Sequence, residues 1–311
     1  MKYDFIPNEK LKEIIDEKVI YSGSFPDSEE IADLTIPEGI EEIAENAFRD
    51  FESIKKLTLP KSLKKIGASA FSGCKNLTTV EFSDGLTEIC DEAFAFASSL
   101  LSVNMPNSVK RIGEGAFEGC ASLSKLTISE SCEMIGSGAF SYCFNLRDVS
   151  IPDSVLLIEF NAFASCFSLE SVKLSESMGL IDESTFEGCR SLVTVDMPRA
   201  LKKIGRRAFK DCTSLGSLIL PHGVLEVGLD AFSGCSALTR IAIPRGVREL
   251  EDREVFFGCD SLSDISYGGS REEWEYLLRG GELLVTRSDN SLHAPRITCL
   301  NLGKNEDNIS V

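Results

Sequence analysis

The chain is poor in the residues that catalytic and metal sites use most often. Its 311 residues include two histidines, His222 and His293, and none of its eleven cysteines forms a C-x-x-C pair. Histidine is the usual acid–base group near neutral pH, and closely spaced cysteine pairs mark most zinc sites. These shortages argue against histidine-dependent catalysis and against structural zinc.

Long apolar runs and an excess of positive charge are also missing. No segment approaches the roughly 18 apolar residues that a membrane-spanning helix needs, so we expect no insertion into a bilayer. Acidic residues outnumber basic ones by 49 to 32, for a net charge of −17. A surface of this sign repels the phosphates of nucleic acids, which argues against DNA or RNA as a partner.

Catalytic motifs and an export signal are absent as well. The sequence holds no G-x-S-x-G, no phosphate-binding glycine loop and no H-E-x-x-H. We therefore expect no cofactor, and an enzyme is the weakest hypothesis for function. The first ten residues include Asp4, Pro7 and Glu9 and lack the apolar core of a signal peptide. As given, the sequence indicates the cytoplasm, where thiols stay reduced.

What the sequence does contain is an internal repeat of 23 residues that fills residues 32–262 with ten copies. A phenylalanine, usually after alanine, marks each copy, and a cysteine often follows three residues later. The phenylalanines are Phe48, Phe71, Phe94, Phe117, Phe140, Phe163, Phe186, Phe209, Phe232 and, after one inserted residue, Phe256. The cysteines are Cys74, Cys120, Cys143, Cys166, Cys189, Cys212, Cys235 and Cys259.

Each copy predicts a short strand, a bend and a single helical turn. In the copy that begins at Lys55, Leu57 alternates with polar neighbours, as a half-buried strand requires, and Pro60 ends that strand. Phe71 and Cys74 then have the spacing of a helical turn that faces the core. One such unit cannot bury its own apolar side, whereas stacked units bury one another's. The repeat therefore predicts a solenoid with short parallel strands.

In a solenoid, equivalent residues of successive copies lie one above another. We predict one buried ladder of phenylalanines and one of cysteines, with Phe163 buried between its two neighbours in the ladder. The ladder cysteines should act as small buried hydrophobes whose side chains point in parallel, so we expect free thiols. Cys90, Cys132 and Cys299 lie off the ladder and are the better candidates for a reactive thiol.

The pattern from Leu57 to Leu77 resembles the BspA-type leucine-rich repeat of bacterial and some protist proteins. The tail is similar too, because Tyr267-Gly268-Gly269-Ser270 with Trp274 looks like the segment that closes many such arrays. The resemblance implies a leucine-rich-repeat solenoid, a right-handed superhelix rich in short parallel strands, with single helical or 3-10 turns. It also implies binding of proteins or carbohydrates at the cell surface, if an export signal is missing from this chain.

We expect a cap at each end of the repeats, because the ends of a stack would otherwise expose strand edges. The predicted divisions are an N-terminal cap at 1–31, the repeats at 32–262 and a C-terminal cap at 263–311. The N-terminal cap has two interpretations, a degenerate repeat or an amphipathic helix that uses Leu11 and Val19. The C-terminal cap should begin with a short helix from Arg271 to Arg279.

Three successive repeats depart from the polar pattern of the predicted second strand. Its solvent-side position holds Glu, Lys or Arg in seven repeats but Met134, Leu157 and Leu180 in the others. Further unexpected apolar residues nearby are Leu156, Phe144, Phe160 and Phe167. We predict that these seven residues contribute to a partner-binding surface and that the stripe of Met134, Leu157 and Leu180 could join two copies. The alternative is that a loop of the same chain covers them.

A basic cluster is the second candidate surface. It consists of Lys202, Lys203, Arg206, Arg207 and Lys210. A solvated edge is one interpretation, and an anionic partner is the other. That partner could be the acidic segment Met1–Ile54 of a second copy, in a head-to-tail association.

The sequence is compatible with three classes of function. A non-enzymatic protein-binding module, such as a bacterial BspA-like adhesion or interaction protein, is the main hypothesis. A carbohydrate-binding surface protein is the second, although one tryptophan, Trp274, and five tyrosines offer few aromatic platforms for sugars. An enzyme is the third, and no spacing of carboxylates suggests its active site.

Overall fold

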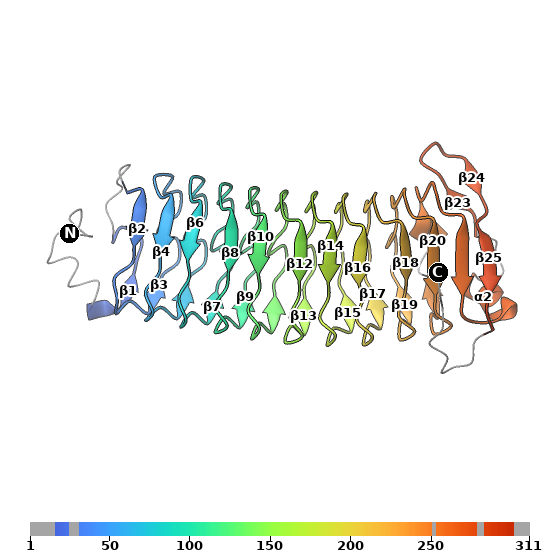
Figure 1. The fold of residues 1–311 in the computed structure, drawn as a ribbon, viewed down its shortest axis with the longest axis horizontal. Helices are drawn as coiled ribbons and strands as arrows, with labels where there is room; N and C mark the ends of the chain where they lie inside the picture. Colours follow the sequence, from blue (N-terminus) through green and yellow to red (C-terminus); the bar gives the residue numbers. More distant parts are fainter. Residues whose placement is uncertain (1–15, 25–30, 251–252, 279–282, 302–311) are drawn as a thin grey trace. The chain divides into compact units, whose positions relative to one another are not determined.

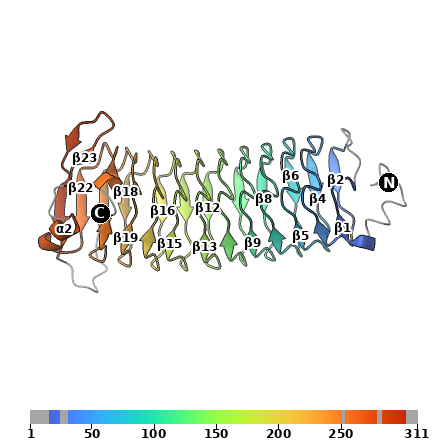
Figure 2. The same cartoon turned by 180° about the vertical axis from the view of Figure 1, so that it is seen from behind.

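The computed structural model describes residues 16–24, 31–250, 253–278 and 283–301. The chain divides into two compact units, Met1–Val155 and Leu156–Val311. Each unit is a repeat solenoid of short parallel strands with little helix, which confirms the predicted fold class (Figures 1 and 2). The predicted borders of the caps stay predictions.

In the first unit, each repeat contributes one strand of three residues and one of two. The longer strands are β2 (Asp33–Thr35), β4 (Lys56–Thr58), β6 (Thr79–Glu81), β8 (Ser102–Asn104), β10 (Lys125–Thr127) and β12 (Asp148–Ser150). The shorter strands are β1 (Val19–Ile20), β3 (Glu42–Ile43), β5 (Lys65–Ile66), β7 (Glu88–Ile89), β9 (Arg111–Ile112) and β11 (Met134–Ile135). Neighbouring strands from β2 to β10 and from β1 to β11 pair in parallel and in register over one repeat, as Leu34 opposite Leu57 illustrates.

The second unit repeats this plan and ends in a cap. Its longer strands are β14 (Ser171–Lys173), β16 (Thr194–Asp196), β18 (Ser217–Ile219), β20 (Arg240–Ile243), β22 (Asp264–Tyr267) and β25 (Arg296–Cys299). Its shorter strands are β13 (Leu157–Ile158), β15 (Leu180–Ile181), β17 (Lys203–Ile204), β19 (Glu226–Val227) and β21 (Glu249–Leu250). A 3-10 turn, η1 (Arg253–Phe256), precedes the cap.

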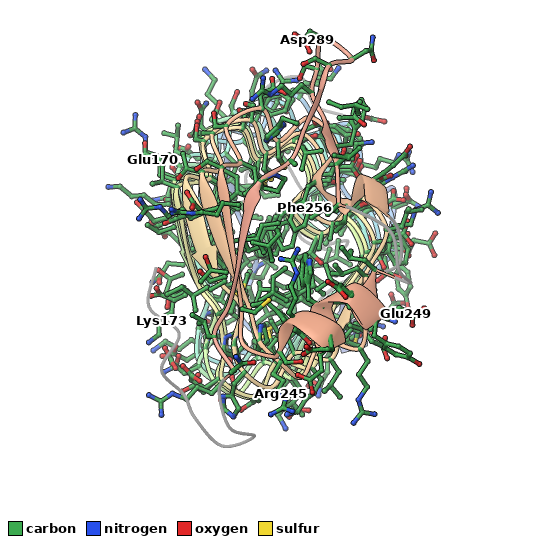
Figure 3. All side chains as sticks on the ribbon, turned by 90° about the vertical axis from the view of Figure 1, so that its right-hand side faces the viewer. Glu170, Lys173, Arg245, Glu249, Phe256 and Asp289 are labelled. Carbon is green, nitrogen blue, oxygen red and sulfur yellow. The ribbon has the colours of Figure 1, made fainter. Side chains whose placement is uncertain are left out.

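The phenylalanine ladder forms the centre of both units. All ten ladder phenylalanines are buried, Phe163 among them, and Figure 3 shows Phe256 inside the ring of backbone with Glu249 and Lys173 outside. Phe71 stacks on Phe94 with 5.3 Å between ring centroids, and Phe163 stacks on Phe186 at 5.8 Å. Parallel rings at this spacing bury apolar area without leaving a gap, so the ladder predicted from the 23-residue period is confirmed within each unit.

The segment around each phenylalanine forms turns closed by i→i+3 hydrogen bonds rather than a continuous helix. Ser69 and Gly73, two residues before and after Phe71, have φ angles of 50° and 75°, which interrupt helical geometry. The backbone N–H groups of these three residues donate to the next repeat, from Phe71 to the carbonyl of Ala93 at 2.8 Å, for example. Each unit thus has a third hydrogen-bonded ladder beside its two strand ladders.

Close contact between repeats explains the glycine four residues before many ladder phenylalanines. A Cβ on Gly67 would lie 2.7 Å from the backbone carbon of Ala44, and one on Gly205 would lie 2.7 Å from that of Asp182. Such distances are far below van der Waals contact. Glycine therefore lets the chain turn against the backbone of the preceding repeat.

The C-terminal cap contains the expected short helix as α2 (Arg271–Leu277). Ser270 caps this helix, accepting a hydrogen bond from the N–H of Glu273 while the Glu273 carboxylate accepts one from the N–H of Ser270. Trp274 is buried against Tyr267, with ring centroids 5.2 Å apart. A hairpin of β23 (Val285–Thr286) and β24 (Leu292–His293) leads into β25, which pairs with β22.

At the N-terminal end, most of the predicted cap lies outside the described residues. This includes Leu11, on which both interpretations of the cap depend. Val19 lies in β1, in register with Glu42 of β3.

Candidate binding surfaces

The ladder cysteines have a specific structural role. The Cys74 thiol donates a hydrogen bond to the carbonyl oxygen of Phe48 in the preceding repeat, with 3.2 Å from Sγ to oxygen. The same bond is made by Cys120, Cys143, Cys189, Cys212, Cys235 and Cys259. Because a buried carbonyl gains from a second donor, these cysteines satisfy backbone oxygens as well as filling space.

Burial also lowers the reactivity of the thiols. It raises the pKa of the Cys74 and Cys259 thiols to about 12, far above neutral pH. Off the ladder, burial raises the pKa of Cys90 and Cys132 to about 11. Since the thiolate is the reactive form, both thiols stay protonated near neutral pH, and the expectation that they are more reactive than the ladder thiols stays a prediction. The pKa of Cys299 is raised as well, mainly by desolvation.

Residues suited to metal chemistry or sugar stacking are used elsewhere in the fold. The Nε2 atom of His293 lies 2.6 Å from the carbonyl oxygen of Leu262. The described ranges contain no group of three or more His, Cys, Asp or Glu side chains that could hold a metal ion. Trp274 is buried, so its ring face cannot form a platform for a carbohydrate.

An apolar patch lies on the second unit, formed by Leu156, Leu157, Phe160 and Leu180. The side chains of Leu156 and Phe160 are 64% and 50% exposed, Leu157 is also exposed, and Leu180 is partly exposed. The alternation within β13 turns Ile158 into the core and leaves Leu157 outside.

The first unit indicates how residues at these repeat positions meet. Arg111, at the position of Leu180, contacts Glu88 at 3.0 Å and Asp91 at 3.4 Å. Glu88 and Asp91 occupy the positions of Leu157 and Phe160 in the repeat before. Leu180 therefore occupies the repeat position whose side chain, in the first unit, reaches the positions of Leu157 and Phe160.

The patch coincides with an interruption in the strand ladder of the second unit. The strands β15, β17, β19 and β21 form one sheet, and β13 is not part of it. Gly179, directly before Leu180, has no neighbouring atom within 4 Å of the place where its Cβ would be. The backbone therefore leaves open space beside the exposed leucines.

The other predicted patch residues are placed differently. Phe167 is partly exposed and lies under the guanidinium of Arg190, whose Cζ is 4.7 Å from the ring centroid. Met134 and Phe144 belong to the first unit, where Met134 is partly exposed and Phe144 makes an edge-on contact with Tyr142 at 6.2 Å. A continuous stripe of Met134, Leu157 and Leu180 stays a prediction.

The basic cluster is partly neutralised within the second unit. Lys203 forms an ion pair with Glu226 at 3.0 Å, and Arg207 forms one with Asp230 at 3.6 Å. Lys202, Arg206 and Lys210 complete the cluster, and Lys202 and Arg206 are exposed. The remaining positive charge is carried mainly by residues close to Phe209 in the sequence, Arg206 and Lys210.

Sequence reasoning missed an exposed aromatic residue in the first unit, Phe96. It lies two residues after a ladder phenylalanine, at a position where every repeat has a positive φ and most have Gly, Asp or Ser. The Phe96 side chain is 52% exposed, and its ring lies over Gly119, where a Cβ would be 2.6 Å from Cδ1 of Phe96. The signal was present, because a bulky residue stands where the repeat favours glycine.

Three carboxylates gather beside Phe96 and form what we call the acidic turn: Glu92, Glu114 and Glu118. Partial burial raises the pKa of Glu118 above its usual value, and the charges of Glu92 and Glu114 raise it further. Like charges disfavour ionisation when no cation compensates them. No ion pair within the described residues neutralises this turn.

Comparison with known proteins identifies the repeat. The sequence profile described as "BspA type Leucine rich repeat region (6 copies)" matches residues 18–147 and 133–263. No curated protein sequence matches the chain significantly. Among the described residues, no helix has both the length and the apolar character that crossing a bilayer requires.

Three solved structures illustrate the similarity. A leucine-rich cell-surface protein from Faecalibacterium prausnitzii A2-165 is 30% identical, over 79% of this chain and 81% of its own, with a TM-score of 0.42. A leucine-rich-repeat protein from Bacteroides ovatus is 25% identical, over 90% and 87%, with a TM-score of 0.47. The pneumococcal vaccine antigen PcpA is 23% identical, over 91% and 76%, with a TM-score of 0.57, which supports the fold alone.

The profile match covers well over half of the chain and includes every repeat described above. The family comprises bacterial surface proteins that typically act as binding modules. The chain belongs to the BspA-type leucine-rich-repeat family.

Proposed function

We propose that the chain is a non-catalytic module that binds another protein through the apolar patch of the second unit. The exposure of Leu156 and Phe160, at 64% and 50%, is the observation that carries this proposal. In the fourth repeat, the same positions hold Lys110 and Glu114. A soluble surface gains nothing from leucine and phenylalanine at such positions unless a partner covers them.

The size and edge of the patch fit a protein interface. Burial of one leucine or phenylalanine side chain contributes about 1.5–3 kcal/mol, so the four residues together could anchor a partner. Leu180 is in register with Lys203, so a charged residue follows the patch on this side. An apolar centre with a charged edge is the usual anatomy of protein–protein interfaces.

The chemistry of the patch favours a protein over a carbohydrate. Three of its four residues are leucines, which lack the flat ring faces and hydrogen-bonding groups that sugars require. The tryptophan that could supply such a face, Trp274, is buried against Tyr267. A partner with its own aliphatic or aromatic side chains matches the patch best.

A charge introduced into the patch tests the proposal. The full chain carrying Leu157→Glu should keep the melting temperature of the wild type within a few degrees, because the side chain is already exposed. A photo-crosslinking residue in place of Phe160 should then join one protein in stoichiometric yield in the cells that make this chain. Leu157→Glu should abolish that crosslink.

Ile219 provides a matched control. It is an exposed apolar residue of the same unit but lies on β18, away from the patch. The variant Ile219→Lys should leave crosslinking from position 160 unchanged. Unfolding by Leu157→Glu, or an undiminished crosslink in that variant, would contradict the proposal.

A further inference from the structure

We propose that two copies of this chain associate through turns of opposite charge that occupy the same repeat position in the two units. The acidic turn of the first unit is Glu92, Glu114 and Glu118. The basic turn of the second unit, a part of the basic cluster, is Arg206, Arg207 and Lys210. In the dimer that we propose, the acidic turn of each copy contacts the basic turn of the other.

The two turns match at two of their three residues, and the third acidic residue, Glu92, comes from the preceding repeat. Glu114 and Arg206 each lie three residues before a ladder phenylalanine, and Glu118 and Lys210 each follow one directly. Glu92 and Arg207 share the position two residues before the phenylalanine. Since the backbone of each repeat is the same, these side chains leave their units from equivalent points and present opposite charges on similar surfaces.

The charges of the acidic turn are uncompensated within the described residues. Glu92 accepts a hydrogen bond from the Ser69 hydroxyl at 3.0 Å, which neutralises no charge. The pKa of Glu118 is raised by partial burial and by the charges of Glu92 and Glu114, so the negative charge of Glu118 is disfavoured in the isolated unit. A cationic partner removes this repulsion, and the gain is larger at a partly buried site than in open solvent.

Phe96 adds an aromatic anchor to the acidic turn. Its ring is half exposed and lies over Gly119, next to Glu118. An arginine that approaches these carboxylates can place its guanidinium over the ring, as Arg190 does over Phe167 in the second unit. Arginine on an aromatic face is a frequent feature of strong interface contacts.

The basic turn keeps positive charge for such a contact. Arg207 is held by Asp230 at 3.6 Å, whereas Arg206 is exposed and Lys210 is half buried. No ion pair within the described ranges involves Arg206 or Lys210. The basic turn can therefore bind carboxylates from outside its own unit.

The acidic N-terminal region is a poorer match for the basic turn. Its glutamates Glu41, Glu42 and Glu52 already form ion pairs with lysines, at distances of 2.6, 3.2 and 2.7 Å. Binding a second copy there would break existing pairs, whereas the acidic turn has none to break. A second copy is the occupant we commit to, because each chain carries both complementary turns.

Charge reversal in the full chain tests the proposal by sedimentation. We expect the wild type to dimerise, with a dissociation constant that rises at least about tenfold between low and high salt, because the contact is electrostatic. The variant Glu114→Lys with Glu118→Lys should be monomeric, since both of its turns are basic. The variant Arg206→Glu with Lys210→Glu should also be monomeric, because both of its turns are acidic.

A mixture of the two variants gives the sharpest result. An equimolar mixture should form a one-to-one heterodimer, because every contact again joins opposite charges. The control Glu130→Lys with Glu133→Lys changes two exposed glutamates outside the turn by the same charge and should dimerise like the wild type. A monomeric wild type at high concentration and low salt would overturn the proposal, and so would variants that self-associate normally.

Discussion

The two units share one interior plan but differ in how tightly they follow it. In the first unit, neighbouring ladder rings are separated by 5.1–5.4 Å, and in the second by 5.5–6.0 Å. The shorter strands from β1 to β11 of the first unit belong to one sheet, whereas in the second unit β13 and β15 belong to different sheets. The apolar patch lies at this looser place.

The fold depends on the inward residues of each repeat, and we propose that binding uses the outward ones. The interior phenylalanine and cysteine recur almost without change, and they specify the stack. The outward positions vary freely, from Arg111 in the first unit to Leu180 in the second, because water accepts either charge and the backbone does not depend on them. The proposed binding surfaces lie where these outward residues depart from the usual polar choice.

The largest expected effect comes from alkaline pH, through the buried thiols. Burial raises the pKa of two ladder thiols in the first unit, Cys74 and Cys120, and of four in the second, Cys189, Cys212, Cys235 and Cys259. Above the ordinary cysteine value of 9.0, the unfolded chain loses protons that the folded chain retains, so stability falls as pH rises towards about 12. Each thiol contributes a slope of about 1.4 kcal/mol per pH unit.

Each unit contains five buried cysteines, so we expect both units to lose stability in alkali. Urea unfolding at pH 7 and pH 10 measures the effect. Cys212→Ala with Cys235→Ala should lower stability at pH 7, through lost packing and lost hydrogen bonds, but should reduce the further loss between the two pH values. An equal loss in wild type and variant would show that the thiols are not responsible.

The next effect in size compares the two phenylalanine ladders. Truncation of a ladder phenylalanine to alanine should cost about 3–5 kcal/mol of the free energy of unfolding. We expect Phe94→Ala to lie at the upper end and Phe209→Ala at the lower end, because rings in the second unit are farther apart. Phe163→Ala should fall within the same range.

Phe257→Ala is the control for this comparison, since that ring is exposed beside buried Phe256. It should cost less than about 1 kcal/mol. Equal losses of the free energy of unfolding for the ladder and control variants would contradict a central role of the ladder in stability.

The smallest expected effect concerns the acidic turn. The pKa of Glu118 is raised, so its ionised form is disfavoured in the folded chain, and Glu118→Gln should increase stability at pH 7 by up to about 0.5 kcal/mol after allowance for solvent screening. The gain should shrink as pH falls, because Glu118 then takes up a proton and loses the unfavourable charge.

Glu187 occupies the same position in the second unit and accepts a hydrogen bond from Ser184 at 2.6 Å. Glu187→Gln should therefore give no gain. Thermal unfolding of both variants at pH 7 and pH 4 makes the comparison. A loss of stability in Glu118→Gln would mean that the carboxylate has a favourable contact in its turn.

Much of the fold could be predicted from the sequence because the residues that recur in every repeat are the buried ones. The spacing of Phe71 and Phe94 gave the ladder, and the alternation around Leu57 gave the strand. The left-handed turn residues could not be predicted, since Ser69, which has a positive φ, looks like an ordinary polar residue in the sequence. The hydrogen bond from the Cys74 thiol could not be predicted either, because a cysteine can act both as a buried hydrophobe and as a weak hydrogen-bond donor.

The candidate surfaces were predictable to a smaller extent. Leu156 and Phe160 were found because they break the polar pattern of other repeats, and both are exposed. Phe96 was missed although it departs from the small or polar residues of its repeat position, because the positive φ of that position is visible only in the structure. Whether a carboxylate has a cationic partner also depends on distances in space, which the sequence does not state. Glu42 forms an ion pair with Lys65, whereas the acidic turn forms none within the described residues.

The free energy of unfolding of Leu156→Lys with Leu157→Glu, measured in urea beside the wild type, tests the separation of fold and binding most directly. We predict a value within about 1 kcal/mol of the wild type, because both side chains are exposed and their replacements suit water. A loss of about 3 kcal/mol or more would place the patch in the core and contradict its assignment as a binding surface.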